Sequence, residues 1–191
     1  MNKSHYHELL ESIVNLAEKA GCAILEIYDA GDFVVSQKEN DTPLTQADLA
    51  AHEFLIKYLP IEGMDLPVLS EESSVLSYAA RETWKSFWLV DPLDGTREFL
   101  KKSGEFTVNV AWIENGFPLL GVVHAPVLGV TYYAMQGVGA FKKDAGGIRP
   151  IHAERYESGV LKVVASRSHG REALEPFLNR LSNVESLDIG S

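Results

Sequence analysis

A long alternation of apolar and polar residues in the middle of the chain constrains its fold more than any other feature. From residue 106 on, every second side chain is apolar: Phe106, Val108, Val110 and Trp112. This period of two is typical of a strand with one buried face, and Asn115-Gly116 after it is a strong signal for a tight hairpin turn. Three further segments rich in β-branched and aromatic residues follow: 119–126, 129–134 and 138–141. The sequence therefore predicts an antiparallel sheet.

The same region contains the longest stretch without a formal charge, and this raises the alternative of a membrane span. Its five glycines, with Pro118 and Pro126, argue against a membrane helix over 116–141. The N-terminus carries Glu8 and Glu11 among its apolar residues and so lacks the uninterrupted core of a secretory signal. We therefore expect a protein without a membrane span.

The charge balance narrows the classes of partner. The chain has 17 basic and 27 acidic residues and a formal net charge of -10, which repels nucleic acids and anionic membrane surfaces. A phosphate ligand would therefore need cations at its site. Cys22 is the only cysteine; this excludes an internal disulfide and fits a reducing cytoplasm, and on a helix we expect Cys22 to be a small buried hydrophobe.

Two helices are predicted before the sheet. Apolar residues at steps of three and four indicate an amphipathic helix from about His5 to Tyr28. After a short strand, a polar turn and a return, a second helix carries Asp48 in its first turn and ends at Pro60. Together with the sheet they predict an α+β domain over residues 1–150.

Residues 151–191 form a different pattern, with a strand at 161–165, a helix around 173–181 and a strand at 184–189. This order is one βαβ unit. Thirty residues of this kind cannot bury both faces of a sheet. We therefore expect 151–191 to be the beginning of an α/β domain that is incomplete, and a sheet edge left open in this way would invite pairing with a second copy.

The segment "WLVDPLDGTREFL" (88–100) carries the candidate chemistry. With 27 acidic residues in the chain, some pairs spaced by three arise by chance, so the context must decide. Asp91 closes an apolar run, Pro92 removes a backbone donor, and a short turn through Leu93 can fold Asp94 back beside Asp91. Two carboxylates crowded in this way repel each other unless a cation lies between them. A solvated acidic turn is the structural alternative.

A third carboxylate, Glu71, follows the neighbouring apolar run "PVLS". Ligation by carboxylates and a main-chain carbonyl, such as that of Leu93, suits Mg²⁺. Zinc is not expected, because these motifs contain no His or Cys. Gly95-Thr96 opens a predicted short helix whose N–H groups would face an anion. Carboxylates for a metal beside an anion site indicate phosphate chemistry.

Three motifs, "VLSEES", "WLVDPLDGTREFL" and "GEFTVNVAWIENGFPLLGVVHAP", together resemble the lithium-sensitive, magnesium-dependent phosphatases of the inositol monophosphatase superfamily. The nearest branch is that of the 3'(2'),5'-bisphosphate nucleotidases of the CysQ type, favoured by "EFTVN" and "SRSH". The likeness runs through nearly the whole chain. It implies a layered α-β-α-β-α sugar-phosphatase-like fold.

The resemblance also implies roles for matching positions. Two Mg²⁺ ions would be held by Glu71, Asp91, the carbonyl of Leu93 and Asp94. Thr96, polarised by Asp48 and assisted by Glu71, resembles the group that orients and deprotonates the attacking water. The residues that would contact the substrate are Glu71, Leu93, Asp94, Gly95, Thr96, His169, Gly190 and Ser191. Taken alone, Asp48 and Thr96 are more often helix caps, and His169 a surface or capping residue.

The implied reaction removes the 3'-phosphate of adenosine 3',5'-bisphosphate, and of its sulfated relative 3'-phosphoadenylyl sulfate, during sulfur metabolism. The implied partner is a small phosphonucleotide, not a nucleic acid, in the cytoplasm; the resemblance also allows a peripheral association with the cytoplasmic face of the inner membrane and a homodimer. In the family the second metal takes an aspartate from a downstream "WD" motif. The 191 residues contain no such motif, so we expect this chain to have little activity.

Three other functions remain open at this stage. Hydrolysis of inositol monophosphate is the competitor within the same fold. A non-catalytic module that binds a phosphonucleotide or a metal belongs to another class, and a structural domain with an incidental acidic turn is the third. Phosphate release from each substrate, and Mg²⁺ binding before and after replacement of Asp91 by Asn, would separate these alternatives.

Overall fold

The computed structural model describes residues 3–31, 35–37, 43–62, 64–73, 76–166 and 171–190. The chain divides into two compact units, Met1–Ile151 and His152–Ser191, and each is described by itself. The helices and strands of the first unit are α1 (Lys3–Ala30), β1 (Val35–Gln37), β2 (Pro43–Thr45), α2 (Gln46–Glu62), β3 (Val68–Ser70), α3 (Tyr78–Arg81), β4 (Ser86–Asp94), α4 (Thr96–Leu100), β5 (Thr107–Glu114), β6 (Phe117–Ala125), β7 (Val130–Met135), β8 (Gly139–Asp144) and β9 (Gly147–Pro150).

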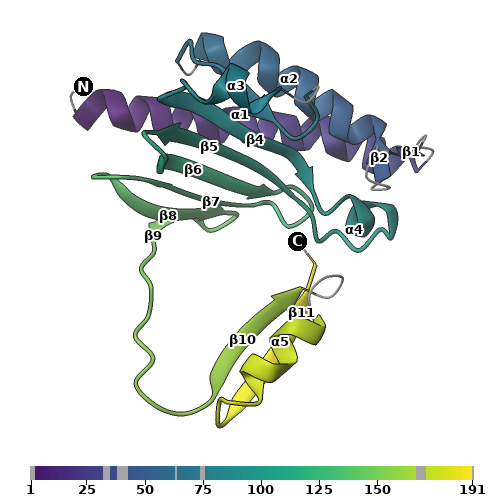
Figure 1. The fold of residues 1–191 in the computed structure, drawn as a ribbon, viewed down its shortest axis with the longest axis vertical. Coiled ribbons are helices and arrows are strands. Elements are labelled where there is room, and N and C mark those ends of the chain that lie inside the picture. The colour runs from purple at the N-terminus through teal and green to yellow at the C-terminus, as the bar shows by residue number, and fades with distance from the viewer. Residues whose placement is uncertain are drawn as a thin grey trace. The chain divides into compact units, whose positions relative to one another are not determined.

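A seven-stranded sheet in the order β3-β4-β5-β6-β7-β8-β9 forms the centre of the first unit (Figure 1). The pair β3–β4 is parallel and every later pair is antiparallel. Asn115 and Gly116, which join β5 to β6, both have positive φ, 49° and 81°, as a type I′ turn requires. The predicted antiparallel sheet and this hairpin are confirmed.

Two long helices cover one face of this sheet, with α1 against β5, β6 and β7 and α2 against β4 (Figure 1). The strand residues on that face are almost fully buried: Trp88, Val90, Val108, Val110, Leu120 and Val122. They pack with apolar residues of the helices: Ile13, Leu16, Ile24, Leu55 and Leu59. Alternate residues point to the other face, and the exposure of Leu89 (43%), Val123 (43%) and Tyr132 (44%) shows that this face is less covered.

A partly buried network of polar side chains links α1 to three strands. The hydroxyl of Thr131 donates to Glu18 Oε1 at 3.0 Å, and Lys143 Nζ donates to Glu18 Oε2 at 2.7 Å. His124 Nδ1 lies 2.9 Å from the same Thr131 hydroxyl. Burial lowers the pKa of His124, while the negative charge of Glu18 acts in the opposite direction. These hydrogen bonds fix the position of α1 on β6, β7 and β8. They are directional, whereas apolar packing is not.

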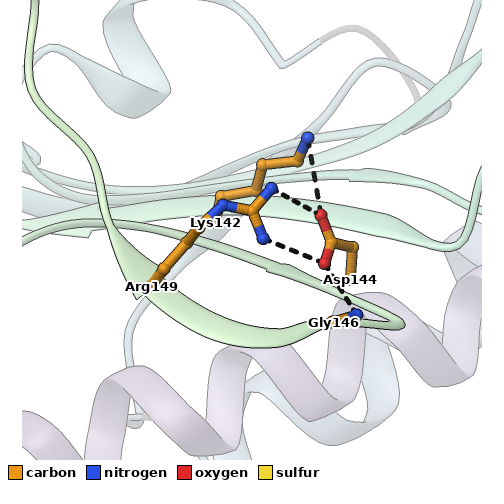
Figure 2. Close-up of polar contacts among 4 residues, drawn as sticks. All are labelled: Lys142, Asp144, Gly146 and Arg149. Carbon is orange, nitrogen blue, oxygen red and sulfur yellow. Dashed lines mark hydrogen bonds and ion pairs between the residues drawn. The ribbon is translucent and has the colours of Figure 1, made fainter.

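Strand β8 contains the predicted strand at 138–141, whereas β9 lies beyond the last strand that the sequence predicted for this sheet. Asp144 accepts two hydrogen bonds from the Arg149 guanidinium, at 3.0 and 2.7 Å, and one from the Gly146 amide at 3.0 Å (Figure 2). These bonds, with Lys142 Nζ at 3.5 Å, hold the pKa of Asp144 well below its usual range. Strand β9 has no buried residue, so no hydrophobic pattern marked it.

Two further predictions are corrected by the structure. Cys22 is exposed, because Ala20 and Ile24, which are fully buried, lie about 160° around the helix from it. Helix α2 does not end at Pro60 but continues to Glu62. Pro60 lies in the last turn, so the lost hydrogen bond and the distortion that a proline causes affect only the end of the helix.

The second unit consists of β10 (Leu161–Ser166), α5 (Arg171–Leu178) and β11 (Val184–Ile189). Strands β10 and β11 are parallel, with Leu161 opposite Val184 and Ser166 opposite Ile189. The βαβ unit that the sequence predicted is therefore present. Across both units, no helix among the described residues combines the length and apolar character that a membrane span needs.

We predict that Gly21→Ala destabilises the first unit. A Cβ atom on Gly21 would lie 2.6 Å from His124 Cδ2 and 3.1 Å from Pro126 Cβ, and His124 cannot retreat without breaking its bond to Thr131. Overpacking of this kind costs about 1–3 kcal/mol, which we expect to exceed the gain of about 1 kcal/mol from alanine in a helix. Urea unfolding measures the change. Gly121→Ala, whose Cβ would meet no atom within 4 Å, is the control, and equal stability of both variants would contradict the prediction.

We predict that stability falls as the pH drops below about 6.5, the ordinary pKa of histidine. Burial lowers the pKa of His124 in the folded state, so the unfolded chain binds more protons in this range and acid favours unfolding. Burial acts in the same direction on His52, so the contribution of His124 must be isolated. His124→Asn should lose less stability than the wild type between pH 7.5 and 5.5 in urea titrations. An unchanged pH dependence in this variant would contradict the assignment.

Candidate functional site

A register shift in β4 places two candidate carboxylates on one face of the sheet. Asp91 lies opposite Asn109 and Asp94 lies opposite Thr107. Between these two pairs β4 advances by three residues, whereas β5 advances by only two. Thr107 and Asn109 share a face because they are two apart, and the buried Val108 and Val110 on β5 point to the helices. The extra residue, a β-bulge, therefore puts both carboxylates on the face away from α1 and α2. The bulge replaces the short turn that the sequence predicted.

The chain leaves this bulge through Gly95 into the short helix α4. Gly95 has φ of 97°, in the left-handed region where glycine has no steric penalty, and its carbonyl accepts from the Phe99 amide at 2.9 Å. Phe99 is fully buried, with its ring centroid 5.4 Å from Phe106 and 5.2 Å from Tyr28. Complete burial of such a side chain stabilises by about 1.5–3 kcal/mol. Phe99 therefore anchors the segment that carries Thr96.

Glu71 comes next to Asp91 through the parallel pair β3–β4. Ser70 lies opposite Val90 in the register, and the Glu71 amide donates to the Val90 carbonyl at 3.0 Å. The side chain of Glu71 is exposed. The backbones of two predicted metal ligands are therefore adjacent.

Asp48 is fully buried and joins the start of α2 to α4. Its Oδ2 accepts from the Thr45 amide at 2.8 Å and from the Thr45 hydroxyl, and the Thr45 oxygen accepts from the Ala47 amide at 3.2 Å. This reciprocal arrangement resembles a capping box. Its Oδ1 accepts from Thr96 Oγ1 at 3.1 Å. Asp48 thus combines the two roles that the sequence left as alternatives, a helix-start partner and a partner of Thr96.

The Thr96 hydroxyl has two acceptors within reach but a single hydrogen. Asp48 Oδ1 is 3.1 Å away and the Leu93 carbonyl 3.4 Å away. The shorter contact is to a carboxylate, which makes the stronger hydrogen bond when ionised. Donation to Asp48 leaves the lone pairs of Thr96 Oγ1 available to accept a hydrogen bond from a third group.

Sequence reasoning missed three polar residues near these groups. Asn109, on the same face as Asp91, has a buried Oδ1 with no hydrogen-bond partner in the part of the chain that is described. It lines a cavity of about 630 Å³ that also contacts Asp91, Glu71 and Ser70. His52 Nδ1 lies 2.8 Å from Ser70 Oγ, and burial lowers the pKa of His52. The sequence did contain a signal for Asn109: it is a polar residue in β5 on the face opposite the buried valines, and it pairs with Asp91.

The donor atoms around the bulge fit a hard divalent cation. Asp91, Asp94, the Leu93 carbonyl and Asn109 Oδ1 are all oxygen donors, the type that Mg²⁺ prefers. Within the described ranges, however, no three His, Cys, Asp or Glu side chains lie close enough to form a ready metal cluster. The chemistry of the donors therefore fits Mg²⁺, and Glu71 lines the same cavity as Asp91 and Asn109. Metal binding by these residues stays a prediction.

Three residues that were predicted to contact the substrate, His169, Gly190 and Ser191, follow the first unit in the sequence. His169 and Ser191 fall outside the described residues. Gly190 directly follows β11 in the second unit. Their contacts to a substrate therefore stay predictions.

Comparison with known proteins identifies the family. Residues 5–188 match the model of the inositol monophosphatase family. A Salmonella typhimurium protein named 3'(2'),5'-bisphosphate nucleotidase CysQ is 45% identical over 184 residues, which are 96% of this chain and 73% of that protein. The protein of the same name from Escherichia coli strain K12 is 42% identical over 184 residues, again 96% of this chain and 73% of that protein.

Solved structures agree with this assignment. The crystal structure of CysQ from Bacteroides thetaiotaomicron, described as a bacterial member of the inositol monophosphatase family, is similar with a TM-score of 0.80 and 35% identity over 95% of this chain and 72% of that one. The Thermotoga maritima IMPase has a TM-score of 0.72 and 25% identity over 94% of this chain and 68% of that one. The predicted superfamily and its α+β fold are confirmed: the chain belongs to the inositol monophosphatase family.

Proposed function

We propose that this protein is a Mg²⁺-dependent phosphatase that hydrolyses the 3'-phosphate of adenosine 3',5'-bisphosphate to give AMP and phosphate. The hydrogen bond from Thr96 to the buried Asp48, beside the bulge that carries Asp91 and Asp94, is the observation that carries the proposal. The names of relatives 42–45% identical support the substrate class. Metal dependence is general in the inositol monophosphatase family, and the all-oxygen donors favour Mg²⁺.

The residues of the chain would divide the work between binding and proton transfer. Asp91, Asp94, Glu71 and the Leu93 carbonyl would hold the cation. Bound Mg²⁺ supplies positive charge that neutralises the phosphate and makes water more acidic. Asp48 accepts the Thr96 hydrogen, which turns the lone pairs of Thr96 Oγ1 outward to accept a hydrogen bond from water. As that water attacks phosphorus, its proton would pass to Thr96 and the Thr96 proton to Asp48, while the bond from phosphorus to the 3'-oxygen breaks and the 3'-oxygen takes a proton from solvent water.

The location of the protein and its partners are part of the same proposal. A small phosphonucleotide as substrate agrees with the excess of acidic residues, since the cations rather than a basic patch would attract it. We propose action in the cytoplasm. Four points stay predictions: association with the inner membrane, a homodimer, separate domains over 1–150 and 151–191, and low activity of this chain. Gel filtration tests the homodimer.

We predict that phosphate release from adenosine 3',5'-bisphosphate requires Mg²⁺ and exceeds release from inositol 1-phosphate at least about tenfold, because a site that makes contacts to one substrate discriminates by 10-fold or more against another that lacks them. The assay compares both substrates, and 3'-phosphoadenylyl sulfate as a third, with Mg²⁺ and with EDTA. It also measures how active this chain is. Faster hydrolysis of inositol 1-phosphate, or turnover that persists in EDTA, would refute the proposed function.

We predict that Thr96→Val lowers the rate of phosphate release about 10²–10⁴-fold, because valine has the shape of threonine but cannot accept the water proton. Thr96→Ser keeps the hydroxyl and should stay within about tenfold of the wild type. Initial rates at saturating substrate give the comparison, and thermal unfolding in EDTA checks that both variants are folded. A valine variant as active as the serine variant would remove Thr96 from the reaction.

A further inference from the structure

Helix α2 carries a second polar residue one turn beyond Asp48. Residues four apart lie on the same side of a helix, so His52 follows Asp48 along the side that faces the strand ends. Asp48 reaches α4 through Thr96, whereas His52 reaches the end of β3, where its Nδ1 lies 2.8 Å from Ser70 Oγ. One helix therefore contacts both segments that flank the bulge of β4.

Ser70 connects His52 to the turn that carries Glu71. Ser70 is 6% exposed, and its Oγ accepts from the Glu72 amide at 3.4 Å. Its carbonyl accepts from the Ser73 amide at 3.1 Å. The two amides that follow Glu71 are thus hydrogen-bonded to Ser70, and the side chain of Ser70 is bonded in turn to His52.

Ser70 Oγ can donate its own hydrogen to a residue at position 52. It already accepts from Glu72 N–H, and when neutral His52 carries its ring hydrogen on Nε2, Nδ1 accepts the Ser70 hydrogen. Asparagine at position 52 would place an amide oxygen near the position of Nδ1 and keep this acceptor. Leucine would fill a similar volume without any acceptor.

We infer that His52 is a positioning residue for the metal site: through Ser70 it holds the turn 71–73, and so sets the backbone from which Glu71 reaches toward Asp91. This inference rests on the part of the proposed function in which Glu71 is a metal ligand. The inference adds that α2 fixes the positions of Glu71 and Thr96 relative to each other, because His52 and Asp48 belong to the same helix.

Titration of the purified, metal-free protein with Mg²⁺ in a calorimeter tests this inference without any need for turnover. Groups that orient a metal ligand typically contribute 10–100-fold to metal affinity. We therefore expect His52→Leu to raise the Kd for Mg²⁺ at least about tenfold and His52→Asn to stay within about threefold of the wild type. Glu53→Leu, an exposed neighbour on α2, is the matched control and should leave the Kd unchanged.

Ser70→Ala provides an independent route to the same interaction. We expect it to weaken Mg²⁺ binding at least as much as His52→Leu does, because it removes the bond to His52 and also the bond from the Glu72 amide. The double variant should bind no more weakly than Ser70→Ala alone, because the bond to His52 is already lost in that variant. Ser70→Ala and His52→Asn carry the test if His52→Leu does not fold, which thermal unfolding in EDTA reveals. A Kd unchanged in Ser70→Ala or His52→Leu, no rescue by asparagine, or additive losses would overturn the inference.

The two proposals fail in different ways. If the wild type binds Mg²⁺ with the expected dependence on His52 but releases no phosphate from the nucleotide, the inference stands and the proposed function fails. If the protein is an active nucleotidase and His52→Leu has the same Kd for Mg²⁺ as the wild type, only the inference fails. In an active protein, His52→Leu should raise the Mg²⁺ concentration for half-maximal rate and leave the rate at saturating Mg²⁺ within about threefold of the wild type.

Discussion

Strand β4 contains one residue more than β5 between Asp91 and Asp94, and the arrangement of the candidate site follows from this excess. Without it, side chains three apart would point to opposite faces of the sheet, and Asp94 would be directed into the apolar core under α1 and α2. Burying an unpaired carboxylate there would cost several kcal/mol. The bulge avoids that cost and at the same time brings the carboxylates to the face where Asn109 and Glu71 lie.

Much of the fold could be predicted because its signals are local. The turn Asn115-Gly116 needs positive φ at both positions, and few other residue pairs allow it. The steps of three and four in α1 and of two in β5 correspond directly to buried faces. The candidate carboxylates were also found from sequence, because two apolar runs, "PVLS" and "FWLV", are followed directly by Glu71 and Asp91.

The features that escaped prediction depend on contacts between distant segments. Pro92 suggested a turn, yet pairing with β5 keeps β4 extended through Asp94. The exposed β9 follows from the bonds between Asp144 and Arg149 across its hairpin, which leave no periodicity in the sequence. Nor could the sequence show that His52 contacts Ser70, since 18 residues separate them. Such contacts exist only once the helix lies on the sheet.

The packing of α1 also has a consequence for synthesis on the ribosome. Helix α1 ends at Ala30, whereas its partners β5, β6 and β7 end only at Met135. At about 5–20 residues per second, the apolar stripe of α1 waits roughly 5–20 s for the strands that will cover it. During that interval the helix presents Ile13, Leu16 and Ile24, all fully buried in the finished fold, to whatever binds nascent apolar segments. The strands that cover one side of α1 are therefore made well after the helix itself, and α2 is the one long element that can pack on α1 before them.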